Sequence, residues 1–276
     1  TSPLTATSIG TSGANVASSL TGTTILLTAQ SARFIDNSSN NLLITPSGTP
    51  AITSAHPFAA PTTSSYNTQY STTFDGNGDK LSIATNAAFT FGTSDFTIEC
   101  WFFTSSATVS IFDLRNTITQ VTPYIYAVSS TLRYYVSGAD RITSTALSLN
   151  TWYHLALVRA SGVTKMYLNG VQTGSSYTDA NNYISNAVNI GAGYAASQQH
   201  TGLISNLRVV NGVAVYTGAF TPPTSPLTAT QSAGTNISAI TGTSTSLLTC
   251  QNNRLMDSSM NNFAITKNGD TIPYRF

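Results

Sequence analysis

Apolar and polar residues alternate in short runs along most of this chain. The clearest run follows Asp95, and its apolar positions on one face are Phe96, Ile98, Cys100 and Phe102. Bulky residues also occupy the other face, which predicts a central strand covered on both sides. Nowhere do apolar residues recur at spacings of three, four and seven over a dozen positions, so no amphipathic helix is expected.

Further strands are predicted at short spacing, separated by turns rich in glycine and asparagine. Asn169-Gly170 is the sharpest hairpin signal, because a type I′ turn needs positive φ at both central positions. The remaining predicted strands are 71–74, 80–83, 109–114, 124–128, 132–136, 142–145, 152–159, 165–168, 188–190, 202–210 and 214–216. Many short strands with such turns predict an all-β fold. Polar outer faces favour an antiparallel two-sheet sandwich over a barrel.

The two ends of the chain carry copies of one segment. Residues 1–7 (Thr-Ser-Pro-Leu-Thr-Ala-Thr) recur as residues 224–230, and the match continues over about 50 residues. Matched pairs further along are Leu26 and Leu247, Arg33 and Arg254, Asp36 and Asp257, Asn40 and Asn261, Ile44 and Ile265, and Gly48 and Gly269. The repeat indicates one full unit followed by the opening of a second, as in a tandem array. A terminal duplication without an array is the alternative.

This organisation predicts three parts. Residues 1–22, rich in Ser, Thr, Gly and Ala, are expected to form an extended connector. Residues 23–222 are expected to form the sandwich, which is densest over 66–220. Residues 223–276 begin a second copy of the N-terminal segment.

Both copies of the repeated segment contain short β-prone runs. They are 25–28 and 42–45 in the first copy, and 246–249 and 263–266 in the second. The second copy lacks a core of its own. Its strands must therefore add to an edge of this sandwich or pair with an adjacent chain.

The composition is that of a folded chain with little charge. Among the 276 residues, 41% are hydrophobic and only 8% are charged, with a formal net charge of +1. Binding to nucleic acid or to an anionic membrane surface is not expected from such a chain. No apolar run approaches the roughly 18 residues of a membrane span. Cys100 and Cys250 do not make a disulfide framework and are expected to be buried free thiols.

Four segments, 70–81, 91–101, 152–159 and 166–170, occur in an order that resembles laminin-G-like, concanavalin-A-like jelly-roll domains. A narrower resemblance is carried by 202–227. It is similar to a subset of these modules found in tandem in structural and fibre-like proteins of marine bacteriophages. The resemblance implies a jelly-roll sandwich, and for the subset it implies virion display, outside cells, or contact with a host surface.

No catalytic arrangement is visible in the sequence. Jelly-roll glucanases, which share the implied fold, use two carboxylates about 5 to 9 Å apart. This chain has a single glutamate, Glu99, and no close Asp pair on a predicted strand. Glu99 is expected to pair with an arginine such as Arg159 or Arg208, or to lie at the sheet rim, and His154 is expected to be a hydrogen-bonded core imidazole. We therefore expect no catalytic residues and no enzymatic activity.

A calcium site is one candidate. Asp75-x-Asn77-x-Asp79 matches the first half of an EF-hand loop, but later positions lack the required Gly and Glu. A glycine-rich turn in which aspartate binds its own backbone is the alternative. Some members of the resembled family hold Ca²⁺ at the sandwich rim, which makes Asp75, Asp79 and Asp95 candidate ligands. No other cofactor is expected.

A sugar-binding site would need exposed aromatic rings beside amide or carboxylate groups. The candidates, all in predicted loops, are Tyr177, Asp179, Asn181, Tyr183, Tyr194 and Gln198. Loop tyrosines can equally pack on their own scaffold.

The repeat, the low charge and the missing catalytic groups lead to one hypothesis. The chain is expected to be a non-enzymatic structural or adhesive module of a bacteriophage virion, in a fibre, a tail-associated protein or a capsid decoration. Its expected partners are copies of itself or other virion proteins, through residues 1–60 and 224–276, and host-surface glycans. The alternative is a carbohydrate-binding module of a phage receptor-binding protein or of a bacterial surface adhesin or filament.

Overall fold

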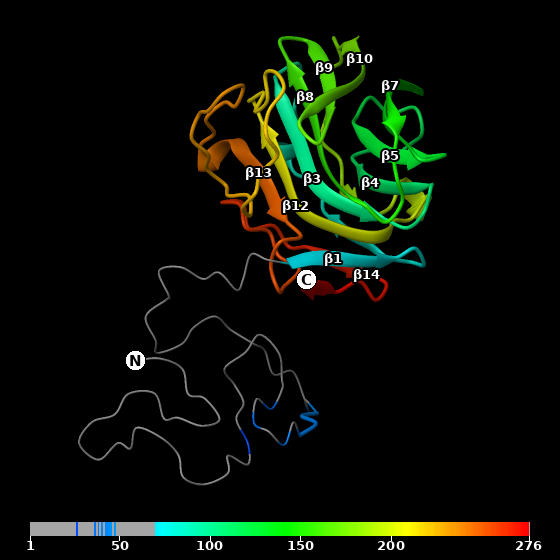
Figure 1. Cartoon of the computed structure of the whole chain (residues 1–276), viewed down its shortest axis with the longest axis vertical. Helices are drawn as coiled ribbons and strands as arrows, with labels where there is room; N and C mark the ends of the chain where they lie inside the picture. The colour runs from blue at the N-terminus through cyan, green and yellow to red at the C-terminus, as the bar shows by residue number, and fades with distance from the viewer. Residues whose placement is uncertain are drawn as a thin grey trace, which may run out of the picture. The chain divides into compact units, whose positions relative to one another are not determined.

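A computed structural model describes residues 70–275, together with residues 26, 36, 38, 40, 42–45 and 47. The chain divides into two compact units, Thr1–Ser64 and Ser65–Phe276. Two antiparallel sheets make up the described part of the second unit (Figure 1), as the alternation of apolar and polar residues predicts. The all-β sandwich is therefore confirmed.

The first sheet has eight strands, seven of them in the order β10-β9-β8-β3-β12-β1-β15. Their bounds are β10 Val171–Thr178, β9 Val163–Leu168, β8 Trp152–Ala160, β3 Phe96–Thr104, β12 Thr201–Asn211, β1 Tyr70–Asp75 and β15 Pro273–Arg275. The eighth strand, β13 (Thr245–Thr249), pairs with β12 beyond the end of β1. Strands β1 and β13 thus follow each other along one edge of β12.

The second sheet has seven strands in the order β14-β2-β11-β4-β5-β6-β7. Their bounds are β14 Thr266–Asn268, β2 Lys80–Ile83, β11 Val188–Ile190, β4 Val109–Asp113, β5 Tyr124–Val128, β6 Thr131–Val136 and β7 Ala139–Ala146. Three single-turn 3₁₀ helices, Ala87–Phe89, Tyr194–Ala196 and Gly242–Ser244, complete the regular structure of this part of the chain. None of the helices described is long and apolar enough to cross a membrane.

Strand β3 lies at the centre of the first sheet, between β8 and β12, as its two apolar faces predict. Phe96, Ile98 and Phe102 point into the main core between the sheets. On the opposite face Thr97 bonds the backbone of Val213 and Val215, in a smaller apolar cluster formed by residues 213–240 and the sheet. The loop after β12 therefore covers the outer side of the central strands.

Strands from both ends of the described sequence are brought together in the two sheets. Strands β13, β14 and β15 belong to the C-terminal repeat segment, and each pairs with a strand of the same chain, namely β12, β2 and β1. Figure 1 shows β13, in orange, lying beside β12. The prediction left open whether these strands join this sandwich or an adjacent chain, and in the structure they join this sandwich.

Three predictions of secondary structure were wrong in detail, and two strands, β10 and β15, were not predicted. Strand β10 (Val171–Thr178) was not predicted because its sequence is polar. It pairs with β9 as the second strand of the hairpin at Asn169-Gly170. Residues 214–216 do not form a strand, although Tyr216 makes an isolated bridge. Residues 42–45 have no regular structure, and the strand expected at 263–266 begins at Thr266. The expected connector, 1–22, lies outside the described residues, as does most of 25–28.

Candidate functional site

The only glutamate is buried in a charge cluster on the outer side of the first sheet. Its Oε1 accepts hydrogen bonds from Arg208 Nε at 2.8 Å and Nη2 at 2.6 Å, and its Oε2 accepts one from the Tyr216 hydroxyl at 2.7 Å. The Nε2 atom of His154 lies 3.3 Å from Oε2 of Glu99. The predicted arginine pairing is confirmed, with Arg208, whereas Arg159 binds the backbone carbonyls of Gly92, Thr93 and Asn181.

This cluster is structural. Burial raises the pKa of Glu99, but Arg208, and then His154 and Tyr216, lower it to about 2. An ionised carboxylate with no exposed surface cannot protonate a leaving group, which general acid catalysis requires. Two shallow hollows of about 250 and 320 Å³ lie near Tyr216, and neither is lined by a carboxylate. Glu99 therefore stabilises the fold and offers no route to glycoside hydrolysis.

The candidate sugar ligands fall into two separate groups. Four of them, Tyr177, Asp179, Asn181 and Tyr183, do lie together. Asp179 is buried, and its Oδ2 accepts hydrogen bonds from the hydroxyls of Tyr183 and Thr164, each at 2.6 Å. Its Oδ1 accepts a bond from Asn181 Nδ2 at 2.7 Å.

This first group closes on itself. The Tyr183 ring is buried in the main core, and its hydroxyl also bonds the hydroxyl of Tyr134. Tyr177 lies on β10 and not in a loop, with the Arg141 guanidinium 5.2 Å from its ring centroid. The group therefore joins the two sheets from inside. Its polar atoms bind one another, so it offers few of them to a ligand.

The second group lies on the outer face of the second sheet. Tyr194 and Gln198 approach Tyr124 on β5, whose hydroxyl bonds both Ser110 and Gln198. Side chains alternate along β5 and β6, so Ile125 and Tyr134 enter the core while Tyr124, Tyr126 and Tyr135 point away from it. We call Tyr124, Tyr126, Tyr135 and Tyr194 the tyrosine face.

Arg115 holds the tyrosine face together. Its guanidinium carbon lies 3.7 Å from the ring centroid of Tyr124, 4.9 Å from that of Tyr135 and 5.1 Å from that of Tyr194. The same guanidinium makes a bidentate interaction with Asp113, donating from Nε to Oδ1 at 2.9 Å and from Nη2 to Oδ2 at 2.8 Å. Asp113 also accepts the backbone N–H of Tyr194 at 2.8 Å. These bonds fix the rings in position.

The outer rings of this face remain partly exposed. Tyr126, Tyr135 and Tyr194 are half-buried, whereas Tyr124 is buried and stacks on Tyr126 with centroids 4.5 Å apart. Burial, and then the bond to Asp140, raises the pKa of Tyr126 to about 12, so its hydroxyl stays protonated at neutral pH. Fixed aromatic faces beside protonated hydroxyls and amide groups can stack on a ligand and bond it at once. Tyr194 and Gln198 were predicted from the sequence, whereas Arg115 was not, because its role depends on tyrosines from three elements.

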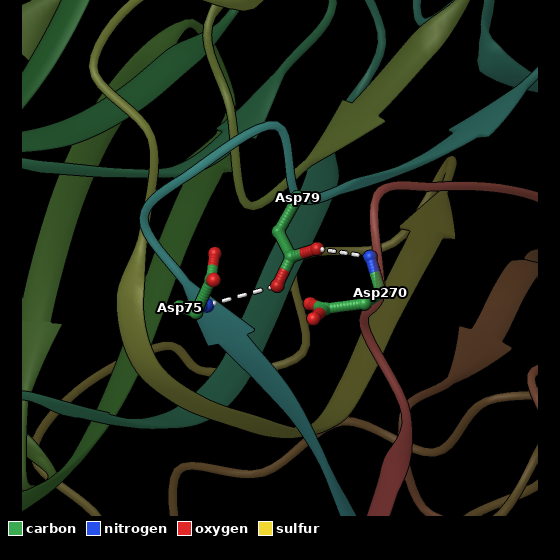
Figure 2. A group of neighbouring side chains, drawn as sticks. All are labelled: Asp75, Asp79 and Asp270. Carbon is green, nitrogen blue, oxygen red and sulfur yellow. Dashed lines mark hydrogen bonds between the residues drawn. The ribbon is translucent and has the colours of Figure 1, made fainter.

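The candidate calcium residues are also rearranged. Asp75, Asp79 and Asp270 lie together at the turn between β1 and β2, with one carboxylate oxygen of each within 4.8 Å of the others (Figure 2). Asp95 is not part of the group, since its carboxylate accepts the N–H of Ser161 at the far end of β8. The third aspartate comes from the C-terminal repeat segment, which sequence spacing could not indicate.

Oxygen donors of this kind suit Ca²⁺, but Asp79 already uses most of the acceptor capacity of its carboxylate within the protein. Its Oδ1 accepts the N–H groups of Asp270 and Thr271, at 2.8 and 2.9 Å, and its Oδ2 accepts that of Asp75 at 2.9 Å. These bonds join the β1–β2 turn to the C-terminal segment. Calcium binding by Asp75 and Asp79 stays a prediction.

Comparison with known proteins agrees with this fold. A candidate carbohydrate-binding protein from Bacteroides ovatus matches with a TM-score of 0.51 at 14% identity, over 76% of this chain and 60% of that one. Domains LG4–5 of the mouse laminin α1 chain match with a TM-score of 0.41 at 19% identity, over 51% and 41% of the two chains. The chain thus spans less than two thirds of the length of either structure. No curated protein matches it in sequence.

The family comparison is stronger than these individual likenesses. The model of the concanavalin A-like lectin/glucanases superfamily matches residues 75–222, which is more than half of the chain. The matched span runs from the end of β1 through β12 and includes every residue of the tyrosine face, but it ends before β13. By its sequence and its two-sheet sandwich, the chain belongs to the concanavalin A-like lectin/glucanases superfamily, in its laminin-G-like group.

Proposed function

We propose that this protein is a non-enzymatic carbohydrate-binding module and that its sugar lies on the tyrosine face. The observation that carries the proposal is the pair of half-buried rings of Tyr135 and Tyr194 around the buried Arg115. The half-buried ring of Tyr126 stacks on Tyr124 in the same face. The apolar face of a tyrosine ring packs against the C–H face of a sugar, while its hydroxyl bonds sugar hydroxyls. Because Arg115 and Asp113 already hold the rings, little side-chain entropy is lost on binding.

The charges of the chain favour a neutral ligand. A formal net charge of +1 gives no field for a polyanion. The charge of Arg115 at the centre of the face is neutralised by Asp113, whose Oδ2 lies 2.8 Å from Arg115 Nη2. The candidate carbohydrate-binding protein of similar fold from Bacteroides ovatus supports a carbohydrate as the ligand.

A glycan array followed by calorimetry on the best sugar tests the proposal. Tyr126→Ala and Tyr194→Ala each remove one ring of the face, and we expect each to weaken binding by about 10-fold or more. Tyr177→Ala is the matched control, because Tyr177 belongs to the closed group and should leave binding unchanged. Binding that is lost with Tyr177→Ala and kept with the other two would move the site to β10.

We further propose that the module is displayed on a virion surface, where it contributes to assembly or to attachment on host glycans. The resemblance of residues 202–227 to modules of marine bacteriophage structural proteins supports this, together with the repeated segment. Antibody against the chain should label purified phage particles by electron microscopy. Labelling of bacterial cell surfaces without particles would instead favour an adhesin or filament.

A further inference from the structure

The C-terminal repeat segment completes the sandwich from which it extends. Strand β13 occupies the edge of β12 between residues 207 and 210, and β14 covers the edge of β2. Leu247 on β13 is fully buried in the main core, and Phe263 packs against Phe89 with ring centroids 5.4 Å apart. Without residues 224–276 these two edges and this part of the core would be open.

The loop between β13 and β14 contains a turn, residues 257–263, with a specific set of hydrogen bonds. Asp257 Oδ1 accepts the N–H of Ser259 at 2.8 Å, and its Oδ2 accepts the Ser259 hydroxyl at 2.8 Å and the N–H of Phe263 at 3.0 Å. Ser259 Oγ in turn accepts the N–H of Asn261 at 3.2 Å. The loop therefore keeps its shape through one aspartate and one serine.

The same four hydrogen bonds occur among the described residues of the N-terminal copy. Asp36 Oδ1 accepts the N–H of Ser38 at 2.8 Å, and its Oδ2 accepts the Ser38 hydroxyl at 2.7 Å and the N–H of Leu42 at 3.0 Å. Ser38 Oγ accepts the N–H of Asn40 at 3.3 Å. Asp36 and Ser38 are as buried as Asp257 and Ser259, so the two copies share a local structure as well as a sequence.

The copies differ in what their apolar side chains contact. Leu26 is 52% exposed, whereas its counterpart Leu247 is 0% exposed. Leu42 is 49% exposed, whereas its counterpart Phe263 packs against the main core. The described part of the N-terminal copy thus has the same four hydrogen bonds, but it exposes Leu26 and Leu42, whose counterparts Leu247 and Phe263 pack in the sandwich.

We propose that residues 1–50 are a closing segment for a second sandwich of this same fold, one whose β12 and β2 edges lack their own. Main-chain pairing along an open edge and burial of Leu26 and Leu42 would supply the affinity. In a tandem arrangement each repeat segment would then close the sandwich that precedes it, and residues 224–276 are the example of such closure in this chain.

The test opens the sandwich within the full chain. Leu247→Asp places a charge in the core and displaces β13, so residues 1–50 become the only intact closing segment present. The segment and the opened sandwich belong to the same chain, which gives a high effective concentration. We expect hydrogen exchange in peptides covering 26–45 to slow about tenfold or more relative to wild type. Light scattering then distinguishes a monomer, in which the segment closes the opened sandwich of its own chain, from an oligomer, in which it closes that of a second copy. Both results support the proposal, because in both the segment pairs with opened β12 and β2 edges.

Two substitutions in the Leu247→Asp background separate closure from non-specific collapse. Leu26→Asp should abolish the protection, because Leu26 takes the place of Leu247. Leu43→Asp should keep it, because the counterpart of Leu43 is Ala264, which stays exposed in the closed sandwich. In the otherwise wild-type chain, Leu26→Asp should leave the melting temperature unchanged.

A milder variant guards against loss of folding. Asp257→Ala removes the acceptor that shapes the C-terminal loop but leaves Leu247 in place, and its matched partner is Asp36→Ala. The proposal is overturned if exchange over 26–45 is unchanged in both Leu247→Asp and Asp257→Ala. It is equally overturned if Leu26→Asp and Leu43→Asp have the same effect.

Discussion

Glu99→Gln tests whether the buried charge cluster makes this fold sensitive to acid. The pKa of Glu99 is lowered from 4.5 to about 2 in the folded chain, because Arg208, His154 and Tyr216 outweigh the effect of burial. The unfolded chain therefore takes up the proton first as the pH falls. The contribution of Glu99 to stability is complete above about pH 4.5 and is lost progressively down to about pH 2. The difference between these two pKa values corresponds to about 3 kcal/mol of stability.

Urea unfolding followed by tryptophan fluorescence measures this contribution. Trp101 is a suitable reporter, since its ring lies 5.2 Å from that of His154 in the same cluster. Glu99→Gln should lose about 3–5 kcal/mol at neutral pH, because Arg208 is left buried without its partner. As the pH falls from about 4.5 to about 2.5, the free energy of unfolding of Glu99→Gln should then decrease by about 2–3 kcal/mol less than that of wild type.

Two controls separate the pair from general acid effects. Glu99→Gln combined with Arg208→Met removes both charges and should recover part of the stability lost at neutral pH, since an uncharged pair leaves no unpaired ion. Glu99→Gln and wild type are compared at the same urea and salt concentrations at each pH, so that acid effects common to both chains cancel. If Glu99→Gln loses as much stability as wild type between about pH 4.5 and pH 2.5, the assignment of acid sensitivity to this cluster is wrong.

Three further predictions concern single positions. Burial lowers the pKa of His200 from 6.5 to about 4, so wild type should lose stability as the pH falls from about 6.5 towards 4, and His200→Gln should flatten that part of a pH–stability curve. Asp79→Ala removes the acceptor of three backbone N–H groups and should cost about 2–4 kcal/mol in urea unfolding with chelator present; a chelator that alone destabilised wild type as much would instead place Ca²⁺ there. Gly170→Ala would bring a Cβ into collision with the carbonyl oxygen of Phe220 at φ +80°, and its melting temperature should fall by about 2–4 °C for each kcal/mol lost; an unchanged melting temperature would contradict the close approach.

The sequence-based predictions succeeded where neighbouring residues decide the structure. The alternation after Asp95 depends only on the two-residue period of a strand, and β3 is central and covered on both faces as predicted. Asn169-Gly170 predicts its hairpin because the turn needs positive φ, which both residues adopt. They failed at β10, where a polar strand next to β9 has no apolar pattern of its own.

The candidate sites were less predictable, because their residues meet across long stretches of sequence. The sequence indicated that Glu99 needs an arginine, but only the register of β3 and β12 selects Arg208. Composition placed Tyr183 and Tyr194 in one candidate site, yet Tyr183 lies in the core and Tyr194 lies beside Arg115. The local composition shows which chemical groups are present. It does not show on which face of a sheet each side chain lies.

By itself the sequence determined the all-β class, most of the strands, the repeated segment and the lack of a close carboxylate pair on any predicted strand. Each of these depends on residues close together in the chain or on simple counts. The tertiary structure decided which aspartates meet at the β1–β2 turn, which tyrosines surround Arg115 and which edge the C-terminal segment closes. These contacts join residues far apart in sequence. They form only when two sheets pack in a single register, and the burial of the common core selects that register.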